Sequence, residues 1–195
     1  MKKRRISWPF VLGICLISVA LFMFLFFQIR IFVGNKISAD IVSKTESLLP
    51  ERSVGDPEIY STTVMPVLQI DRTDYVALLE IKSMGVKLAV ADRWDSGALY
   101  RSPARYYGSA YDNTLVIGGA DSSKQFSFCG KIDQGVTVIL TDMTGAEFTY
   151  KVSMVDRAKS AENEWLSDEE SDLTLFCRDT YSMEYIAVRC VLEYS

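Results

Sequence analysis

The hydrophobic pattern divides the chain into a long apolar run near the N-terminus and a later region of short alternating segments. Residues 8–27 form 20 consecutive positions without a charge. A helix rises ~1.5 Å per residue, so a helix over this run spans the ~30 Å hydrocarbon core of a bilayer. The run exceeds the apolar core of a typical signal peptide, and no small-residue cleavage site follows it closely. It predicts an uncleaved transmembrane anchor over residues 8–29.

From Met65 onward, β-rich runs are separated by turn residues at roughly ten-residue spacing, which is typical of a sandwich or barrel. The preceding residues 30–64 are polar, with weak helical periodicity and chain-breaking Pro50 and Gly55, and they predict a stalk. The pattern over residues 65–195 predicts an all-β barrel with short helices near residues 163–170 and after Ser122. Strands are expected at residues 75–81, 86–91, 114–117, 136–141, 147–155, 173–176 and 185–192.

Charge predicts how the chain is oriented. The formal net charge is −4, yet residues 1–36 hold six basic and no acidic side chains, which leaves −10 on the remainder. The positive-inside rule places a basic tail, residues 1–7, in the cytoplasm and the barrel outside the cell membrane, on a single-pass anchor. The acidic remainder argues against a nucleic-acid partner, because phosphate contacts need clustered Lys and Arg.

The chain has no histidine, and its four cysteines are scattered. The first fact excludes Ser-His and Cys-His catalytic pairs and His-ligated metal sites. The cysteines form no C-x-x-C pattern, so they predict neither a zinc site nor a disulfide framework. Cys15 and Cys129 suit apolar positions, whereas a bridge between Cys177 and Cys190 is left open.

Two other groups of residues have structural interpretations. Asp121, Asp142 and Glu147 form no calcium-loop pattern and are expected to be solvated turn carboxylates. Trp94 and Trp165 are expected to be buried in the barrel wall rather than to line a peptide groove. No metal or other cofactor is predicted.

Six collinear segments between Tyr75 and Cys190 resemble the sortases, the membrane-anchored cysteine transpeptidases of Gram-positive bacteria. The first is similar to the family's Y-x-x-x-L-x-I-P-x-x-G-x-x-L-P-V, with Lys82 and Ala89 in place of its two prolines. The resemblance implies a closed β-barrel of about eight strands at the cell envelope, with a groove for LPxTG-like sorting signals. The six segments are residues 75–90, 102–109 (SPARYYGS), 113–119 (NTLVIGG), 135–145, 173–176 (LTLF) and 188–190 (VRC).

The resemblance also implies three catalytic positions, and this chain departs from the family at each. The family's His follows V-I-A-G, where this chain has Ala120. Its nucleophilic Cys follows T-L-x-T, where this chain has Arg178 and carries Cys177 one residue earlier. Its Arg lies five residues before the final Cys, where this chain has Tyr185. These substitutions predict a non-catalytic protein that binds a peptide, a sorting signal or a partner protein.

The alternative is a divergent transpeptidase or hydrolase that acts through Cys177, with Arg178, Arg189 or Tyr185 in altered roles. A thiol needs a neighbouring base or cation to become a nucleophile. Side chains alternate across a strand, so an extended Cys177 points away from the family's thiol position and Arg178 points into the groove. A β-bulge would re-aim the thiol. A third interpretation is a β-domain that only spaces something from the membrane.

Overall fold

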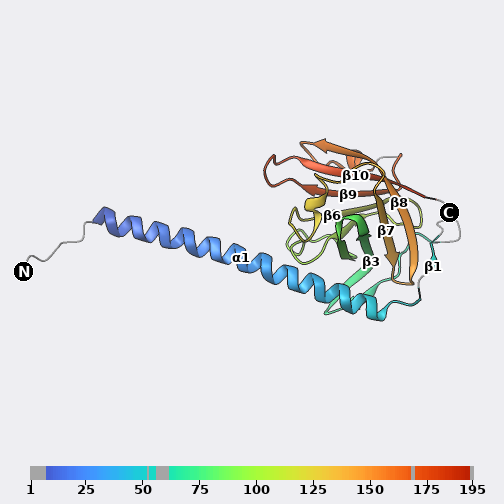
Figure 1. The fold of residues 1–195 in the computed structure, drawn as a ribbon, viewed down its shortest axis with the longest axis horizontal. Helices are drawn as coiled ribbons and strands as arrows, with labels where there is room; N and C mark the ends of the chain where they lie inside the picture. The colour runs from blue at the N-terminus through green and yellow to red at the C-terminus, as the bar shows by residue number, and fades with distance from the viewer. Residues whose placement is uncertain (1–7, 52, 56–61, 168–169, 194–195) are drawn as a thin grey trace, which may run out of the picture.

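The computed structural model describes residues 8–51, 53–55, 62–167 and 170–193 as one long helix followed by a β-barrel (Figure 1). The expected basic tail, residues 1–7, lies outside the described residues. Helix α1 is Trp8–Leu48, α2 is Asn163–Leu166, and two 3-10 turns are η2 (Lys82–Met84) and η3 (Phe126–Phe128). The strands are β1 (Ser53–Val54), β2 (Leu68–Ile70), β3 (Thr73–Ile81), β4 (Val86–Ala91), β5 (Ala104–Tyr107), β6 (Leu115–Gly119), β7 (Thr137–Asp142), β8 (Ala146–Ala158), β9 (Leu173–Arg178) and β10 (Tyr185–Leu192).

Eight of these strands close into a ring. Their order runs β8-β10-β9-β6-β5-β4-β3, and β7 completes the circle because it pairs with both β3 and β8. Closure leaves no free edge among the eight strands, while β1 and β2 add short pairings outside the ring. The predicted closed barrel of about eight strands is confirmed, and α2 and η3 lie where short helices were expected.

The β7–β8 hairpin turns around a buried carboxylate. Asp142 is 0% exposed, and its Oδ1 accepts bonds from the backbone N–H of Thr144 and of Ala146, at 2.8 and 2.9 Å. The Tyr111 hydroxyl donates to Oδ2 at 2.5 Å. The expectation of a solvated turn carboxylate is therefore wrong for Asp142. A buried carboxylate needs such donors to replace water, and the turn supplies them.

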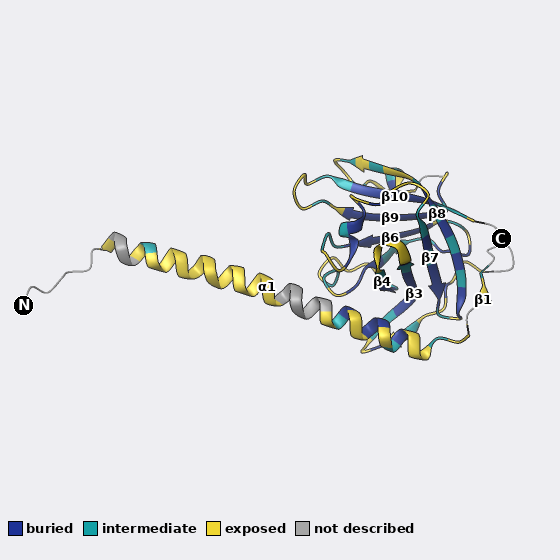
Figure 2. Ribbon diagram, viewed as in Figure 1, coloured by how far each residue is buried: buried dark blue, intermediate teal, exposed yellow. Residues whose placement is uncertain are grey.

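Helix α1 contains an exposed apolar segment, followed by a segment that packs on the barrel. Its stretch Leu12–Ile29 has a mean hydropathy of 2.5 and is 0% buried. Without a break, the helix continues to Leu48, and its C-terminal part packs on the barrel (Figure 2). There Ile41 and Val42 are buried against residues of β3 and β4, including Leu78.

Polar contacts flank the docked segment. Lys44 Nζ lies 2.8 Å from Asp71 in the β2–β3 turn, and Glu46 pairs with Lys87 of β4. The expected stalk over residues 30–64 thus includes a helical segment that lies on the barrel. The few apolar residues of this segment form one stripe, because a docked helix buries only one face.

We predict that Ile41→Ala lowers the free energy of unfolding of the detergent-solubilised chain by about 2–5 kcal/mol, since it leaves a cavity where the side chain was 5% exposed. Urea titrations followed by tryptophan fluorescence measure the change. Leu48→Ala is the matched control, because Leu48 is 59% exposed on the same helix, and it changes stability by less than about 0.5 kcal/mol. Equal effects of the two variants would contradict the docking.

Candidate functional site

The three positions that the sequence resemblance matches to catalytic residues lie side by side. Strands β6 and β9 pair with Gly119 opposite Cys177, so Ala120, the next residue, lies beside Arg178. Strands β9 and β10 pair with Arg178 opposite Tyr185. Neighbouring strands are ~4.8 Å apart, so Ala120 and Tyr185 lie ~10 Å from one another. We call Ala120, Arg178 and Tyr185 the triad row.

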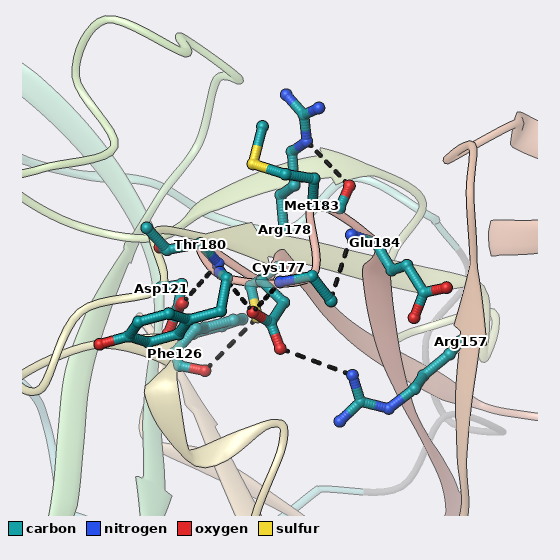
Figure 3. Close-up of polar contacts among 11 residues, drawn as sticks. Asp121, Phe126, Arg157, Cys177, Arg178, Thr180, Met183 and Glu184 are labelled. Atoms are coloured by element: carbon teal, nitrogen blue, oxygen red, sulfur yellow. Dashed lines mark hydrogen bonds and ion pairs between the residues drawn. The ribbon is translucent and has the colours of Figure 1, made fainter.

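The triad row lies on the outer face of the barrel, and Cys177 lies on the inner face. Cys177 is 2% exposed, and its thiol donates to the carbonyl of Phe126 at 3.6 Å (Figure 3). Arg178 is exposed, and its guanidinium carbon lies 5.7 Å from the centre of the Tyr185 ring. Arg178 Nε donates to the Met183 carbonyl at 3.2 Å. The strand alternation places the two side chains on opposite faces, as the extended-strand argument predicts.

The barrel interior does not favour thiolates. Burial, followed by a hydrogen bond with Cys177, raises the pKa of the Cys129 thiol. Burial also raises the pKa of Cys190. A charged sulfur costs more in this apolar interior than in water. The interior therefore holds these two sulfurs as neutral thiols.

The bridge left open between Cys177 and Cys190 does not fit the register. Cys177 lies opposite Ile186, and Cys190 lies opposite Leu173. The two cysteines are thus four residues apart along the ladder, or ~13 Å at strand spacing. A disulfide requires Cα atoms within about 7 Å.

Trp94 lies over the outer face next to the triad row. Its ring stacks on Phe176 with centroids 5.5 Å apart and meets Tyr106 edge-on at 5.1 Å. A Cβ at Gly118 would collide with the Trp94 ring, so only glycine lets the indole approach the strand. Trp94 is 36% exposed. The expected burial in the barrel wall is wrong for Trp94, because the β4–β5 loop carries it onto the outside.

Arg189 holds helix α2 against the outer face of the sheet. It is 2% exposed, and its guanidinium donates to the carbonyls of Trp165 and Leu166 in α2 and to Thr174 Oγ1 at 3.3 Å. It also lies 3.8 Å from the carboxylate of Asp156, which accepts from the Trp165 indole. Arg189 is therefore committed to holding α2 against the sheet, which argues against the altered catalytic role considered for it.

Two hollows open on the same outer face. The larger, of about 600 Å³, is lined by Trp94, Tyr106, Arg105 and neighbouring residues. The smaller, of about 380 Å³, lies between β6 and α2. Tyr107 lines both hollows, and its hydroxyl has no hydrogen-bond partner among the described residues. The larger hollow is lined by charged groups as well as aromatic rings, so it suits a ligand that carries polar groups.

The β9–β10 loop, Asp179–Glu184, is ordered by its own hydrogen bonds (Figure 3). Asp179 Oδ1 accepts from the backbone N–H of Tyr181 and of Ser182, at 2.7 and 3.0 Å. These bonds lower the pKa of the Asp179 carboxyl. Asp121, which follows Ala120, accepts from the Thr180 backbone N–H at 2.9 Å. Asp121 therefore joins the end of β6 to this loop, and no metal-type cluster of three His, Cys, Asp or Glu occurs among the residues described.

Comparison with solved structures assigns the fold. The barrel matches sortase A from Corynebacterium diphtheriae with a TM-score of 0.56 and 17% identity, over 63% of this chain and 62% of that one. Sortase C1 from Streptococcus agalactiae matches with a TM-score of 0.56 and 21% identity, over 65% and 72%. A Clostridium perfringens sortase C, solved with the C-terminal cell wall sorting motif, matches with 0.54 and 18%, over 85% and 89%.

These matches show that the chain has the sortase fold. It spans about 62% of the length of the Corynebacterium protein. No family model matches the sequence. No curated protein matches it.

Sequence reasoning selected the triad row but missed the surface around it. The hollows are built from residues of β5, β6 and the β4–β5 loop, which the strand pattern does not connect. The paired Gly118-Gly119 was a signal, since both glycines lie under aromatic rings, of Trp94 and Phe126 respectively. The sequence named Arg189 but gave no signal that it holds α2, because the bonds to α2 go to backbone carbonyls.

We predict that Arg178→Cys, made in a Cys15→Ala background, creates a thiol that maleimide modifies rapidly in the folded protein. The three remaining native cysteines are 0–2% exposed, so they react only through local opening of the barrel. Mass spectrometry of peptides at successive times measures each site. The Cys15→Ala parent is the control, and rapid modification of Cys177 in that parent would contradict the assignment of faces.

The lowered pKa of Asp179 predicts a pH dependence of the β9–β10 loop. A carboxyl whose folded pKa is depressed stabilises the loop fully above its unfolded value of ~3.9 and loses this effect as the pH falls through the folded value. Amide-exchange protection of Tyr181 and Ser182 should hold from neutral pH to about 4 and decline below it.

In the Asp179→Asn variant, that protection should be weaker at neutral pH and less dependent on pH. The exposed Asp133→Asn serves as the matched control and should leave the loop unchanged. Loss of protection already at pH 5–6 would show that Asp179 does not order the loop, since an ordinary carboxyl is ionised there.

Proposed function

We propose that this chain is a membrane-anchored sortase-fold protein of the cell envelope that binds a peptide on the outer face of β6, β9 and β10 without cleaving it. The triad row carries the proposal. It brings together a methyl group, a guanidinium and a phenol, from Ala120, Arg178 and Tyr185. The sole cysteine adjacent to the row in sequence, Cys177, is buried on the opposite face of its strand.

This chemistry does not support transpeptidation. Acyl transfer needs a nucleophile and a group that moves protons to and from it, and the second is worth ~10²–10⁴-fold in rate. The chain contains no imidazole. A guanidinium carries only hydrogen-bond donors and no acceptor atom, so Arg178 supplies charge but cannot take a proton from a nucleophile.

The same face is well suited to holding a peptide. Aromatic rings of Trp94, Tyr106 and Phe176 pack together between the triad row and the larger hollow, with Trp94 exposed above the buried Phe176. Arg178 is exposed and offers a charge for a carbonyl or carboxylate. The Clostridium sortase C of the same fold was solved with the C-terminal cell wall sorting motif. That pairing supports a sorting-signal-like peptide as the ligand here.

The membrane arrangement is the second part of the proposal. The apolar stretch Leu12–Ile29 is the candidate span. The domains are then a cytoplasmic basic tail (1–7), an anchor (8–29), an extracellular connecting segment (30–64) and the barrel domain (65–195). Four basic residues, at positions 2–5, precede the span and only two, Arg30 and Lys36, follow it. This excess favours a cytoplasmic N-terminus and an extracellular barrel.

The experiment is a titration of an LPxTG-like peptide into the full chain in lipid nanodiscs, followed by calorimetry. We expect saturable binding to the wild type. Trp94→Ala should weaken binding about tenfold or more, because aromatic anchors carry most of the energy of such sites. Met84→Ala, at an exposed residue of η2, is the matched control and should bind normally. Absence of binding in every variant would leave the spacer interpretation.

A second measurement separates binding from catalysis. The same peptide is incubated with an amine acceptor and the products are analysed by mass spectrometry. We expect no product from the wild type, and none from Ala120→His, because Arg178 and Tyr185 still occupy the other two positions. Product from either protein, or an acyl group on Cys177, would establish the divergent enzyme instead.

A further inference from the structure

The barrel docks very near the end of the candidate membrane span. The apolar stretch ends at Ile29, and the packed part of α1 begins at Ile37. Seven helical residues lie between them, and the rise from Ile29 to Ile37 is ~12 Å. The polar headgroup layer on each side of a bilayer is itself ~5–7 Å thick. Because α1 is helical throughout this interval, the barrel is held close to the lipid rather than on a long tether.

One end of the barrel is turned toward the membrane span. Figure 1 shows that the loop joining β9 to β10 projects toward the N-terminal part of α1, beyond the point where the helix meets the barrel. Strand β1 lies at the opposite end. The docking contacts through Ile41 and Val42 hold this orientation.

The β9–β10 loop has the side chains that suit a lipid interface. Tyr181 is 96% exposed and Met183 is 52% exposed. Tyrosine has an apolar ring with a polar hydroxyl, and it is enriched at the level of lipid headgroups for that reason. Bonds to Asp179 and Asp121 order the loop in advance, so little further conformational entropy is lost when it contacts a surface.

We propose that the β9–β10 loop contacts the headgroup layer of the same bilayer that holds α1, with Tyr181 and Met183 inserted into it. This inference rests on the proposed membrane anchoring. It places the triad row, which includes the residues immediately flanking the loop, beside the membrane surface. The peptide bound there is then a segment close to the bilayer, such as the juxtamembrane part of another anchored or emerging chain.

The test places an environment-sensitive fluorophore on single cysteines of the full chain in phosphatidylcholine vesicles. One variant is Tyr181→Cys in a Cys15→Ala background, and the matched control is Val54→Cys in that background. Val54 is 73% exposed and belongs to β1, at the far end of the barrel. Lipids with a quencher near the headgroup should remove most of the fluorescence at position 181 and little at position 54. Equal quenching at both positions, or none at 181, overturns the proposal.

Two further measurements separate this inference from the anchoring on which it rests. Native Cys15, in the candidate span, should be quenched by lipids that carry the quencher deep in the acyl chains. If Cys15 is quenched and position 181 is not, the anchoring stands and the loop contact is wrong. If Cys15 is not quenched, both fail.

A helical insertion supplies the second measurement. Seven added residues between Lys36 and Ile37 move the barrel ~10 Å from the bilayer and rotate it by only ~20°. This insertion should abolish quenching at position 181 and leave quenching at Cys15 unchanged. Persistent quenching at 181 would show that the helix does not set the height of the loop.

Discussion

The strict two-residue alternation of β9 within a closed barrel is the constraint on which the site depends. Leu173, Leu175 and Cys177 point inward, while Phe176 and Arg178 point outward. A slip of one residue would send every side chain to the other face and place a guanidinium in the apolar interior. Because β9 is paired on both sides, with β6 and β10, a slip would also misalign two ladders. The position of Cys177 in the core is therefore set by the whole barrel.

The outer face is organised by the same alternation. Phe176 presents its ring between Trp94 and Tyr106, and Thr174, two residues earlier, meets the buried guanidinium of Arg189. Along β9, the row of Thr174 thus anchors α2 through Arg189, and the next row, that of Phe176, supports the aromatic cluster. The triad row follows, with an exposed charge that no covering segment removes from water. Over three successive rows, the outer face thus changes from buried polar contacts to an exposed cation.

The sequence predicted two of the strands to the residue. Strands β4 and β10 begin and end where the pattern placed them, at residues 86–91 and 185–192. Strand β5 was not predicted from the pattern. It has only four residues, and it pairs with β4 at one position, Ala91 opposite Ala104. The grouping of Ala120 with Arg178 and Tyr185 came from the resemblance and the strand argument together. Trp94 was not predictable, because a loop rather than a periodic element places it.

The docking of α1 on the barrel could not be predicted from the local sequence pattern. A polar segment with a few apolar residues reads equally well as a free stalk or as a helix with one buried stripe, since each leaves most positions exposed. Here Thr45 is fully buried, and its hydroxyl donates a hydrogen bond to the Ile41 carbonyl. The buried stripe therefore includes a polar side chain whose hydroxyl is satisfied. Docking of this stripe couples the direction of α1 to the barrel. The direction in which the outer face opens then follows from the same contacts that stabilise the domain, rather than from any residue of the site itself.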